Sequence, residues 1–369
     1  MLLTTGRTAT AGVRSYPEND YICVMIDALH SKYIIDGVPQ ELTPAGILSS
    51  VMEKAPEPRP VAGTILDETF DPAPGPFELD PARLDDYLAA VMAATGSVSV
   101  PFAAASTRGR VAAALIDTMW RSGNFKLDDL HLTAKWTFNP DKVGDMAAFY
   151  SSVEAAAEYI DTLRISLRRV SCEQGLFDVR FATPFSGAPP LVDDTFHPDP
   201  QSWVVYLPFD TSDYRLGGSL LSQALGLKGG MAPQVEDADY LMDCFEVVRE
   251  FAEDGVLLSA ASVSEGGMYA TLKRMCGDGT GVNADISGVL RSCGVTDPVQ
   301  VLFGEVPGVV IQIRDADFDY IDAEFLLQDV AFFPLGHPTA DGSLHIEYSA
   351  MSGIQTILES LMQNAEGED

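Results

Sequence analysis

The sequence predicts an α/β or α+β fold, and the clearest sign is the order of its apolar segments after residue 200. Short apolar runs typical of strands alternate there with longer amphipathic runs typical of helices, which is the pattern of a sheet covered by helices. The expected strands are Trp203–Leu207, Val256–Ser259, Val309–Ile313 and Val330–Phe333. The expected helices are Tyr240–Ala252, Gly267–Cys276 and Phe318–Gln328. Composition agrees, because hydrophobic residues make up 46% of the 369 residues, enough for a full core.

A third observation is the segment Asp145–Leu163, the clearest helix in the chain. Its apolar residues recur every three or four positions and form one stripe: Met146, Phe149, Tyr150, Val153, Ala157, Ile160 and Leu163. Before it, Tyr21–Ala28 is expected to be a buried strand, and Leu42–Val51 and Ala82–Ala94 are expected to be helices. Repeated prolines between residues 56 and 81 predict a loop or extended linker, and the breaker-rich stretch 182–200 predicts a surface loop or hinge.

Charge and cysteine usage narrow the range of partners. The formal net charge is −31, so the surface repels phosphodiester backbones and anionic membranes, and we expect neither nucleic acid nor a membrane as a partner. No apolar run is long enough to span a bilayer. The five cysteines are scattered and form no CxxC pair, which favours a reducing compartment. We therefore expect a soluble, intracellular protein, most simply a cytoplasmic one.

Two glycine-rich segments are candidate phosphate sites, because glycines allow close backbone approach and amides at a helix start attract anions. One comprises Gly217, Gly218 and Ser219 before an apolar helix, and the alternative to a phosphate site is an ordinary helix start. The other comprises Ser264, Glu265, Gly266 and Gly267 between a strand and a helix. Its alternative is a turn in which Ser264 caps the helix.

The other candidate ligands carry little weight. Asp193-Asp194 and the acids of Asp315–Asp322 could hold magnesium through oxygen atoms, but a solvated acidic surface explains them much better in a chain with 54 acidic residues, where acidic pairs arise by chance. The five histidines have no metal-ligand spacing with one another, so we assign no metal site.

Taken together, four segments resemble the second half of phosphoribosylformylglycinamidine synthase, a member of the aminoimidazole ribonucleotide synthetase fold group. They match the family's segments in order and at about the family's spacing: Leu130–Trp136 with Gly144–Tyr150, Leu216–Leu227, Val256–Leu272 and Leu302–Ile313. The resemblance covers roughly residues 98–339. It implies a two-domain fold with mixed sheets covered by helices. We assign residues 1–97 to a divergent N-terminal segment with a Pro-rich linker, 98–190 and 200–340 to the two synthetase-like domains, and 341–369 to a C-terminal tail.

This sequence departs from the family at the segments that carry its chemistry. The family's GKDS-type loop aligns with Ile165–Ser171, where Arg168 and Arg169 replace the Gly and Lys. Its His-Asp pair aligns with Ala261-Ser262, and its Glu and Asn ligands align with Ala113 and Asp117. Losing oxygen ligands weakens a magnesium site. Arg168 and Arg169 could replace the metal as phosphate partners, or could simply be surface arginines.

The resemblance leaves three functions open. The first is a non-catalytic scaffold or protein-interaction module, and the second is an ATP-dependent synthase subunit or fragment of purine biosynthesis. The third is a nucleotide-sensing binder. ATP or ADP with magnesium is the cofactor that the family implies. Since small members of the group pair their N-terminal sheets, we expect an apolar sheet face and a homodimer, or a complex with a homologous chain.

Overall fold

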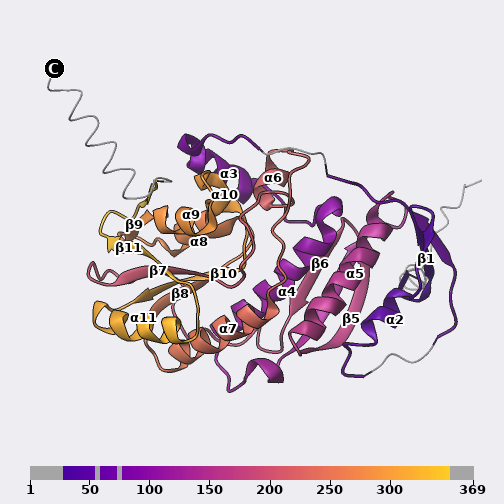
Figure 1. Cartoon of the computed structure of the whole chain (residues 1–369), viewed down its shortest axis with the longest axis horizontal. Helices are drawn as coiled ribbons and strands as arrows, with labels where there is room; N and C mark the ends of the chain where they lie inside the picture. Colours follow the sequence, from indigo (N-terminus) through magenta and orange to yellow (C-terminus); the bar gives the residue numbers. More distant parts are fainter. Residues whose placement is uncertain (1–27, 55–58, 73–76, 350–369) are drawn as a thin grey trace, which may run out of the picture.

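The computed structural model describes residues 28–54, 59–72 and 77–349. The strand expected from Tyr21 falls almost wholly outside these residues, and so does the polar end of the C-terminal tail. Figure 1 shows two layered parts side by side, with a six-stranded sheet in one and a three-stranded sheet in the other. The α/β class predicted from the sequence is confirmed.

The six-stranded sheet has the order β12-β9-β11-β7-β10-β8. Its strands are β7 (Trp203–Pro208), β8 (Leu257–Val263), β9 (Gly281–Asp285), β10 (Gly308–Ile313), β11 (Phe333–Thr339) and β12 (Leu344–Glu347). All neighbours are antiparallel except β12 and β9, so the sheet is mixed. Every residue of the interior strand β10 is buried, because helices cover both faces of the sheet.

Alternate side chains of β7 and β10 pack to opposite faces of this sheet. Val205, Leu207, Val309 and Ile311 join the core under α7 (Ala238–Glu253) and α11 (Phe318–Leu327). Val204, Tyr206 and Val310 join a second core on the other side. That core is covered by α8 (Gly267–Met275), α9 (Ser287–Cys293) and α10 (Pro298–Phe303), together with α3 (Leu84–Ala93). The N-terminal segment therefore contributes a helix to the C-terminal part.

The smaller part is a three-stranded sheet packed on two long helices. Its order is β5-β4-β6, with β4 (His131–Phe138), β5 (Ser166–Gln174) and β6 (Asp178–Ala182). The helices are α4 (Ala103–Met119) and α5 (Asp145–Thr162). The predicted apolar stripe of α5 is buried against α4 and the sheet, and the predicted helix α7 is buried along one side, so both helices cover sheets as expected.

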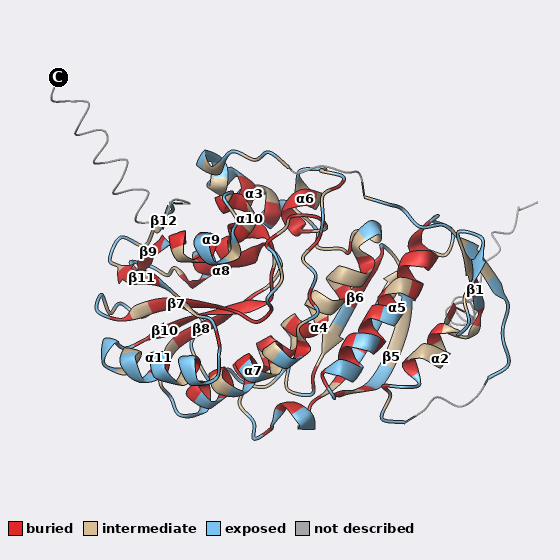
Figure 2. Ribbon diagram, viewed as in Figure 1, coloured by how far each residue is buried: buried red, intermediate tan, exposed pale blue. Residues whose placement is uncertain are grey.

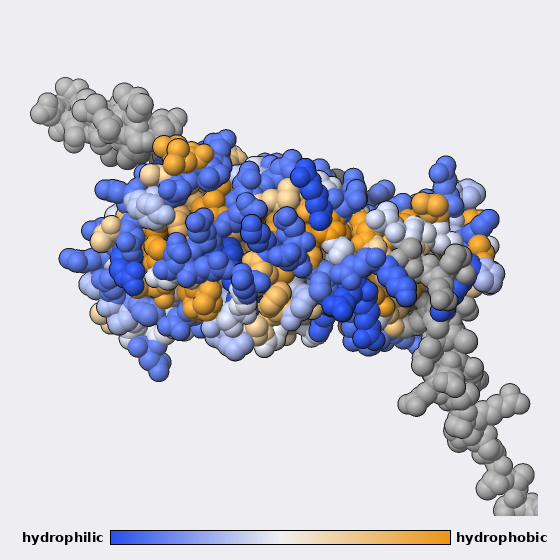
Figure 3. Space-filling model, turned by 90° about the horizontal axis from the view of Figure 1, so that it is seen from below, coloured by the Kyte–Doolittle hydropathy of each residue, from blue (hydrophilic) through white to orange (hydrophobic). Residues whose placement is uncertain are grey.

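The outer face of this small sheet is polar, not apolar as expected from the resemblance. Along β4 the side chains of Leu132, Ala134, Trp136 and Phe138 are buried, and this alternation turns the intervening side chains outward. The outward set on the three strands is Thr133, Lys135, Thr137, Arg169, Ser171, Glu173 and Arg180. On the face drawn in Figure 3, likewise, hydrophilic residues predominate and hydrophobic ones are scattered among them.

Two local expectations were wrong. The segment aligned with the GKDS-type loop is not a loop, because Ser166–Gln174 is a strand hydrogen-bonded to β4. The last large strand begins at Phe333, where the predicted one ends, and it continues through Pro334, Gly336 and Pro338. The domain boundaries remain a prediction, although β12 in the assigned tail pairs with β9.

A small sheet of β1 (Lys32–Ile35), β2 (Val38–Pro39) and β3 (Thr64–Asp67) closes the N-terminal end, beside the short helix α2 (Pro44–Leu48). Asp67 at the end of β3 accepts hydrogen bonds from the amides of Gly144, Met146 and Ala147 at 2.8–2.9 Å. A carboxylate at this end of α5 satisfies its unpaired donors and complements the helix dipole. The sheet therefore fixes the start of the longest helix.

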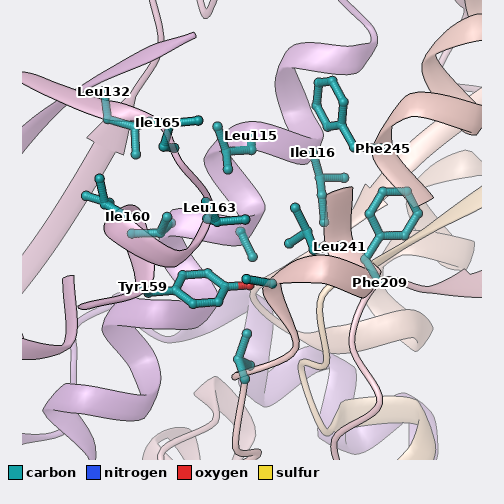
Figure 4. Packing of buried hydrophobic residues seen from close by; sticks show 14 of the residues in the cluster. Leu115, Ile116, Leu132, Tyr159, Ile160, Leu163, Ile165, Phe209, Leu241 and Phe245 are labelled. Carbon is teal, nitrogen blue, oxygen red and sulfur yellow. The ribbon is translucent and has the colours of Figure 1, made fainter. Parts of the chain in front are cut away.

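The two parts share the larger of the two hydrophobic cores. Figure 4 shows Leu115 and Ile116 of α4 and Tyr159 and Ile160 of α5 gathered with Phe209, Leu241 and Phe245 from the C-terminal part. Helix α4 contacts α5 on one side and α7, β8 and β10 on the other. Within the described residues, no helix combines the length and apolar character needed to cross a membrane.

Candidate functional site

A cavity of about 760 Å³ lies between the two parts of the molecule. One wall is formed by α4 and β6, and the other by both glycine-rich segments and the end of β8. The structure thus brings together Gly217, Gly218, Ser219, Ser264 and Glu265, which are far apart in the sequence. A concave site between domains is where small ligands most often bind.

Glycine is required in the first segment by packing. A Cβ on Gly217 would lie 2.5 Å from the carbonyl carbon of Met231, and a Cβ on Gly218 would lie 2.8 Å from Cβ of Phe102. Gly218 also has a φ of +75°, which disfavours other residues. The glycines therefore have a structural reason to be there, whether or not they approach a phosphate.

The helices that follow the two glycine-rich segments have different N-caps. The hydroxyl of Ser219 accepts a hydrogen bond from the amide of Ser222 at 3.2 Å and caps α6 (Leu220–Ala224). The expected hydroxyl cap by Ser264 is wrong, since the N-cap of α8 is Gly266 and the carbonyl oxygen of Ser264 accepts from the amide of Gly267 at 2.8 Å. Of the second segment, Ser264 and Glu265 line the cavity, whereas Gly266 and Gly267 do not.

Glu305 joins the two glycine-rich segments and was missed in the sequence. Its Oε1 accepts hydrogen bonds from the amides of Leu220 and Gly266, both at 2.8 Å. Desolvation of the carboxylate raises its pKa to about 7, nearby Glu265 adds to the rise, and the two amides and Arg110 oppose it. The only signal in the sequence was a carboxylate within the apolar run 301–313.

Arg110 of α4 connects the two walls of the cavity and was also missed. Its Nη2 donates to Oε1 of Glu265 at 2.7 Å, and its Nη1 donates to the carbonyl of Val179 at 2.7 Å and to the Asp178 carboxylate. The Arg110 and Asp178 side chains are mostly buried, so the charge-assisted bond between them is poorly screened by solvent, whereas Glu265 is half exposed. The second glycine-rich segment is thereby tied to β6.

The positions that the resemblance assigns to ligand chemistry do lie on the cavity wall: Ala113, Asp117, Ala261 and Ser262. The two polar side chains among them are bonded to neighbouring side chains. Asp117 pairs with Arg121 at 3.1 Å, and the Ser262 hydroxyl accepts from Nε1 of Trp120 at 2.9 Å. Across residues 28–54, 59–72 and 77–349, no group of three or more His, Cys, Asp or Glu side chains is placed to hold a metal ion.

The remaining sequence candidates are dispersed. Arg168 and Arg169 are exposed on β5 and do not line the cavity; Arg168 instead contacts His131 at 2.9 Å. Asp193 and Asp194 do line it, and Asp193 is 3.0 Å from Nε2 of His197. The acids of Asp315–Asp322 lie outside the cavity wall.

Comparison with known proteins gives the family of the C-terminal part. Residues 209–347 match the family model "AIR synthase related protein, C-terminal domain". Human phosphoribosylformylglycinamidine synthase is 27% identical over 148 residues, which cover 40% of this chain and 11% of that protein. The chain thus spans only a small part of this relative.

Two solved structures are also similar. T. maritima PurL complexed with FGAR has a TM-score of 0.50 at 12% identity, over 71% of this chain and 44% of PurL. The E. coli hydrogenase maturation protein HypE has a TM-score of 0.44 at 12% identity, over 65% of this chain and 75% of HypE. Residues 209–347 therefore match an AIR synthase-related C-terminal domain, within a chain that has an AIR synthase-like fold.

Proposed function

We propose that this chain is a non-catalytic relative of phosphoribosylformylglycinamidine synthase that acts as a scaffold or protein-interaction module and keeps the cavity as a binding site for ATP or ADP. The observation that carries the proposal is the composition of the cavity wall. Where the resemblance implies carboxylate, amide and histidine groups, the wall has Ala113, Asp117, Ala261 and Ser262. Magnesium requires near-octahedral oxygen coordination, and two of these side chains supply no oxygen.

Electrostatics supports loss of turnover. Phosphoryl transfer develops charge that must be met by groups already in place, and removing one such group commonly costs about 10²–10³ in rate. Arg110 is bound to Asp178 and Glu265, so most of its charge is already neutralised. Arg168 and Arg169 lie on another surface, which supports their reading as surface arginines.

The alternative function is an ATP-dependent phosphoribosylformylglycinamidine synthase subunit or fragment. It is favoured by one observation, the size of the cavity, since about 760 Å³ is within the range of small-molecule sites. Affinity for ATP or ADP alone does not separate the two functions, so turnover must be measured.

With formylglycinamide ribonucleotide, ATP, magnesium and ammonium in excess, we expect no ADP production above the rate without protein. An active phosphoribosylformylglycinamidine synthase serves as the positive control. The double variant Arg168→Ala/Arg169→Ala should behave like the native chain. Sustained ADP release that this double variant loses would refute the non-catalytic function and establish an arginine-dependent synthetase.

The assembly we propose is a homodimer, or a complex with a homologous chain, formed through the exposed face of β5-β4-β6. That face carries charges of both signs, since Lys135, Arg169 and Arg180 lie on it with Glu173, so two copies related by a two-fold axis can oppose unlike charges. Light scattering at micromolar concentration is expected to give twice the mass of one chain, 39.7 kDa. Thr133→Glu on this face should shift the equilibrium to monomer, whereas Asp243→Ala on the exposed side of α7 should not. A native monomer with no homologous partner would contradict the proposed interface.

Further partners and location are part of the same proposal. A net charge of −31 favours a basic protein as the scaffold's partner. We place the chain inside the cell, where a reducing environment suits the free thiols of Cys172, Cys244, Cys276 and Cys293.

A further inference from the structure

Helices α7 and α11 lie side by side on one face of the six-stranded sheet and turn their outer sides to solvent (Figure 2). The ring of Phe251 on α7 contacts the ring of Tyr320 on α11, with centroids 6.1 Å apart. Beyond the other end of α11, the amide of Ala331 donates to the hydroxyl of Tyr240 at 2.9 Å, near the start of α7. The two helices therefore run antiparallel, and their outer sides form one surface, which we call the α7–α11 face.

The outer side of α11 has a line of exposed apolar side chains. Tyr320, Ala323 and Leu327 are three and four positions apart, so they share one side of the helix. Tyr320 is 52% exposed and Leu327 is 75% exposed. Because Tyr320 contacts Phe251, this side is the one next to α7. The side of α11 farther from α7 carries Asp319, Asp322 and Leu326. Single exposed apolar residues are common, but a line of them on a ten-residue helix is typical of a surface that another molecule covers.

The outer side of α7 is uniformly acidic. Every exposed residue of this 16-residue helix is an acid, and spacings of three and four positions place them in one stripe: Asp239, Asp243, Glu246, Glu250 and Glu253. The single cation of α7, Arg249, is 6% exposed, and α11 contains none, so neither helix exposes a cation. Like charges at these spacings repel one another along a helix, and a cationic partner would relieve that repulsion.

We propose that the α7–α11 face is the docking surface for a basic amphipathic helix of another protein. The apolar line of α11 lies between the acidic stripe of α7 on one side and Asp319 and Asp322 on the other. A helix laid along this line buries its apolar side there and sets Lys or Arg side chains opposite both rows of acids. The inference rests on the scaffold function proposed above, and it names the surface and the class of partner.

Charge separates this partner from the other candidates for the face. A second copy of the chain would set the same acids against one another, and nucleic acid or an anionic membrane would be repelled. The two terminal segments of the chain supply no surplus of cations either. Residues 350–369 contain no Lys or Arg, and residues 1–27 contain more acids than Lys and Arg.

The probe for the test is a synthetic peptide of about 18 residues, long enough to follow α7 from end to end, with Leu at helical spacings and Lys elsewhere. A second peptide with Glu in place of every Lys is its counterpart. Fluorescence anisotropy measures the affinity of each peptide for the full chain as salt is raised. We expect the Lys peptide to bind with an affinity that falls with salt, and the Glu peptide not to bind.

Charge reversal locates the bound peptide. Asp243→Lys/Glu250→Lys should weaken binding of the Lys peptide roughly tenfold or more, because it reverses two charges within the acidic stripe. The matched control is Asp141→Lys/Asp161→Lys, which changes the net charge equally at exposed positions of the other part of the molecule. The control should weaken binding at most about twofold, since it acts only through the net charge.

A second double variant tests the apolar line. Tyr320→Gln/Leu327→Gln should weaken binding about fivefold or more, because it removes the apolar centre of the interface. The salt dependence should stay unchanged, since no charge is altered. Both side chains are exposed, so we expect this variant to fold like the native chain, which urea titration checks.

Three results would overturn the docking surface. Equal weakening by the two charge-reversed variants would show that the peptide follows net charge alone. Binding that ignores Tyr320→Gln/Leu327→Gln, or no binding of the Lys peptide at low salt, would also overturn it. A change in the mass of the peptide-free protein in Asp243→Lys/Glu250→Lys, seen by light scattering, would assign the face to a contact between copies instead. None of these readouts depends on ADP production, so failure of the docking surface and failure of the non-catalytic function are distinguishable.

Discussion

Arg249→Met is expected to lower the free energy of unfolding by about 3–5 kcal/mol, because it removes a buried cation from the junction of the two parts. The Arg249 side chain on α7 is 6% exposed. It donates to the carbonyls of Met119 at 2.6 Å, Arg121 at 2.8 Å and Gly123 at 2.7 Å, where α4 ends. The Met119 carbonyl belongs to the last turn of α4 and has no partner within the helix, and the other two carbonyls follow that turn. A cation there also complements the helix dipole.

Methionine fills much of the space but leaves these carbonyls without their donor and loses the stacking of the guanidinium over Phe125, whose centroid is 4.3 Å away. The matched control is Arg83→Met, because Arg83 is exposed and its ion pair with Asp86 lies in solvent. The control should leave stability almost unchanged, because an ion pair in solvent contributes little. Urea titration of both variants measures their losses of stability. Equal losses would show that the hydrogen bonds from Arg249 to the end of α4 contribute little.

Gly267→Ala is expected to be the most damaging small substitution in the site, costing about 2–5 kcal/mol. Gly267 has a φ of +69°, and a Cβ there would meet the carbonyl oxygen of Leu302 and lie 2.7 Å from Cα of Phe303. Both neighbours are backbone atoms of the segment that leads to Glu305, so relief requires α8 to move away from α10. We expect the variant to lose stability and to weaken the bond between Gly266 and Glu305.

Gly255→Ala is the control for the backbone conformation alone. Gly255 has nearly the same φ, +68°, and its added Cβ would meet open space. It should cost only about 1–2 kcal/mol, the usual penalty for a left-handed residue other than glycine. If thermal or urea unfolding gave the two variants the same loss, the close approach of α8 to residues 302–303 would be refuted as the reason for Gly267.

The sequence was most informative where periodicity is strong. The apolar stripes predicted α5 and α7 nearly to the residue, because one face of each helix is buried along its whole length. It was misleading in β11, where Pro334, Gly336 and Pro338 signalled a break. There the strand forms because it pairs with β7 and β9 on its two sides. These partners come from other parts of the chain, so the local sequence does not reveal them.

The candidate site was predicted only in part, for a similar reason. The two glycine-rich segments were found as local motifs, and the structure places them on one cavity. Arg110, Arg249 and Glu305 were not found, since each is defined by partners 39 to 155 residues away. An isolated charged residue in a sequence carries no sign of such distant partners. Arg168 and Arg169 are the opposite case. The alignment with the GKDS-type loop predicted that they could contact phosphate, but they lie on β5, which does not line the cavity.

The core that runs through both parts has a consequence for how this protein acquires its structure. Side chains from residue 28 to residue 330 belong to one continuous cluster, and Leu115 or Ile116 is as much a part of the C-terminal half as of its own. A chain cut in the loop around residues 190–200 would give two pieces, each with an uncovered apolar surface. Because each part covers apolar side chains of the other, we expect the two parts to stabilise each other and neither to be fully stable when expressed alone.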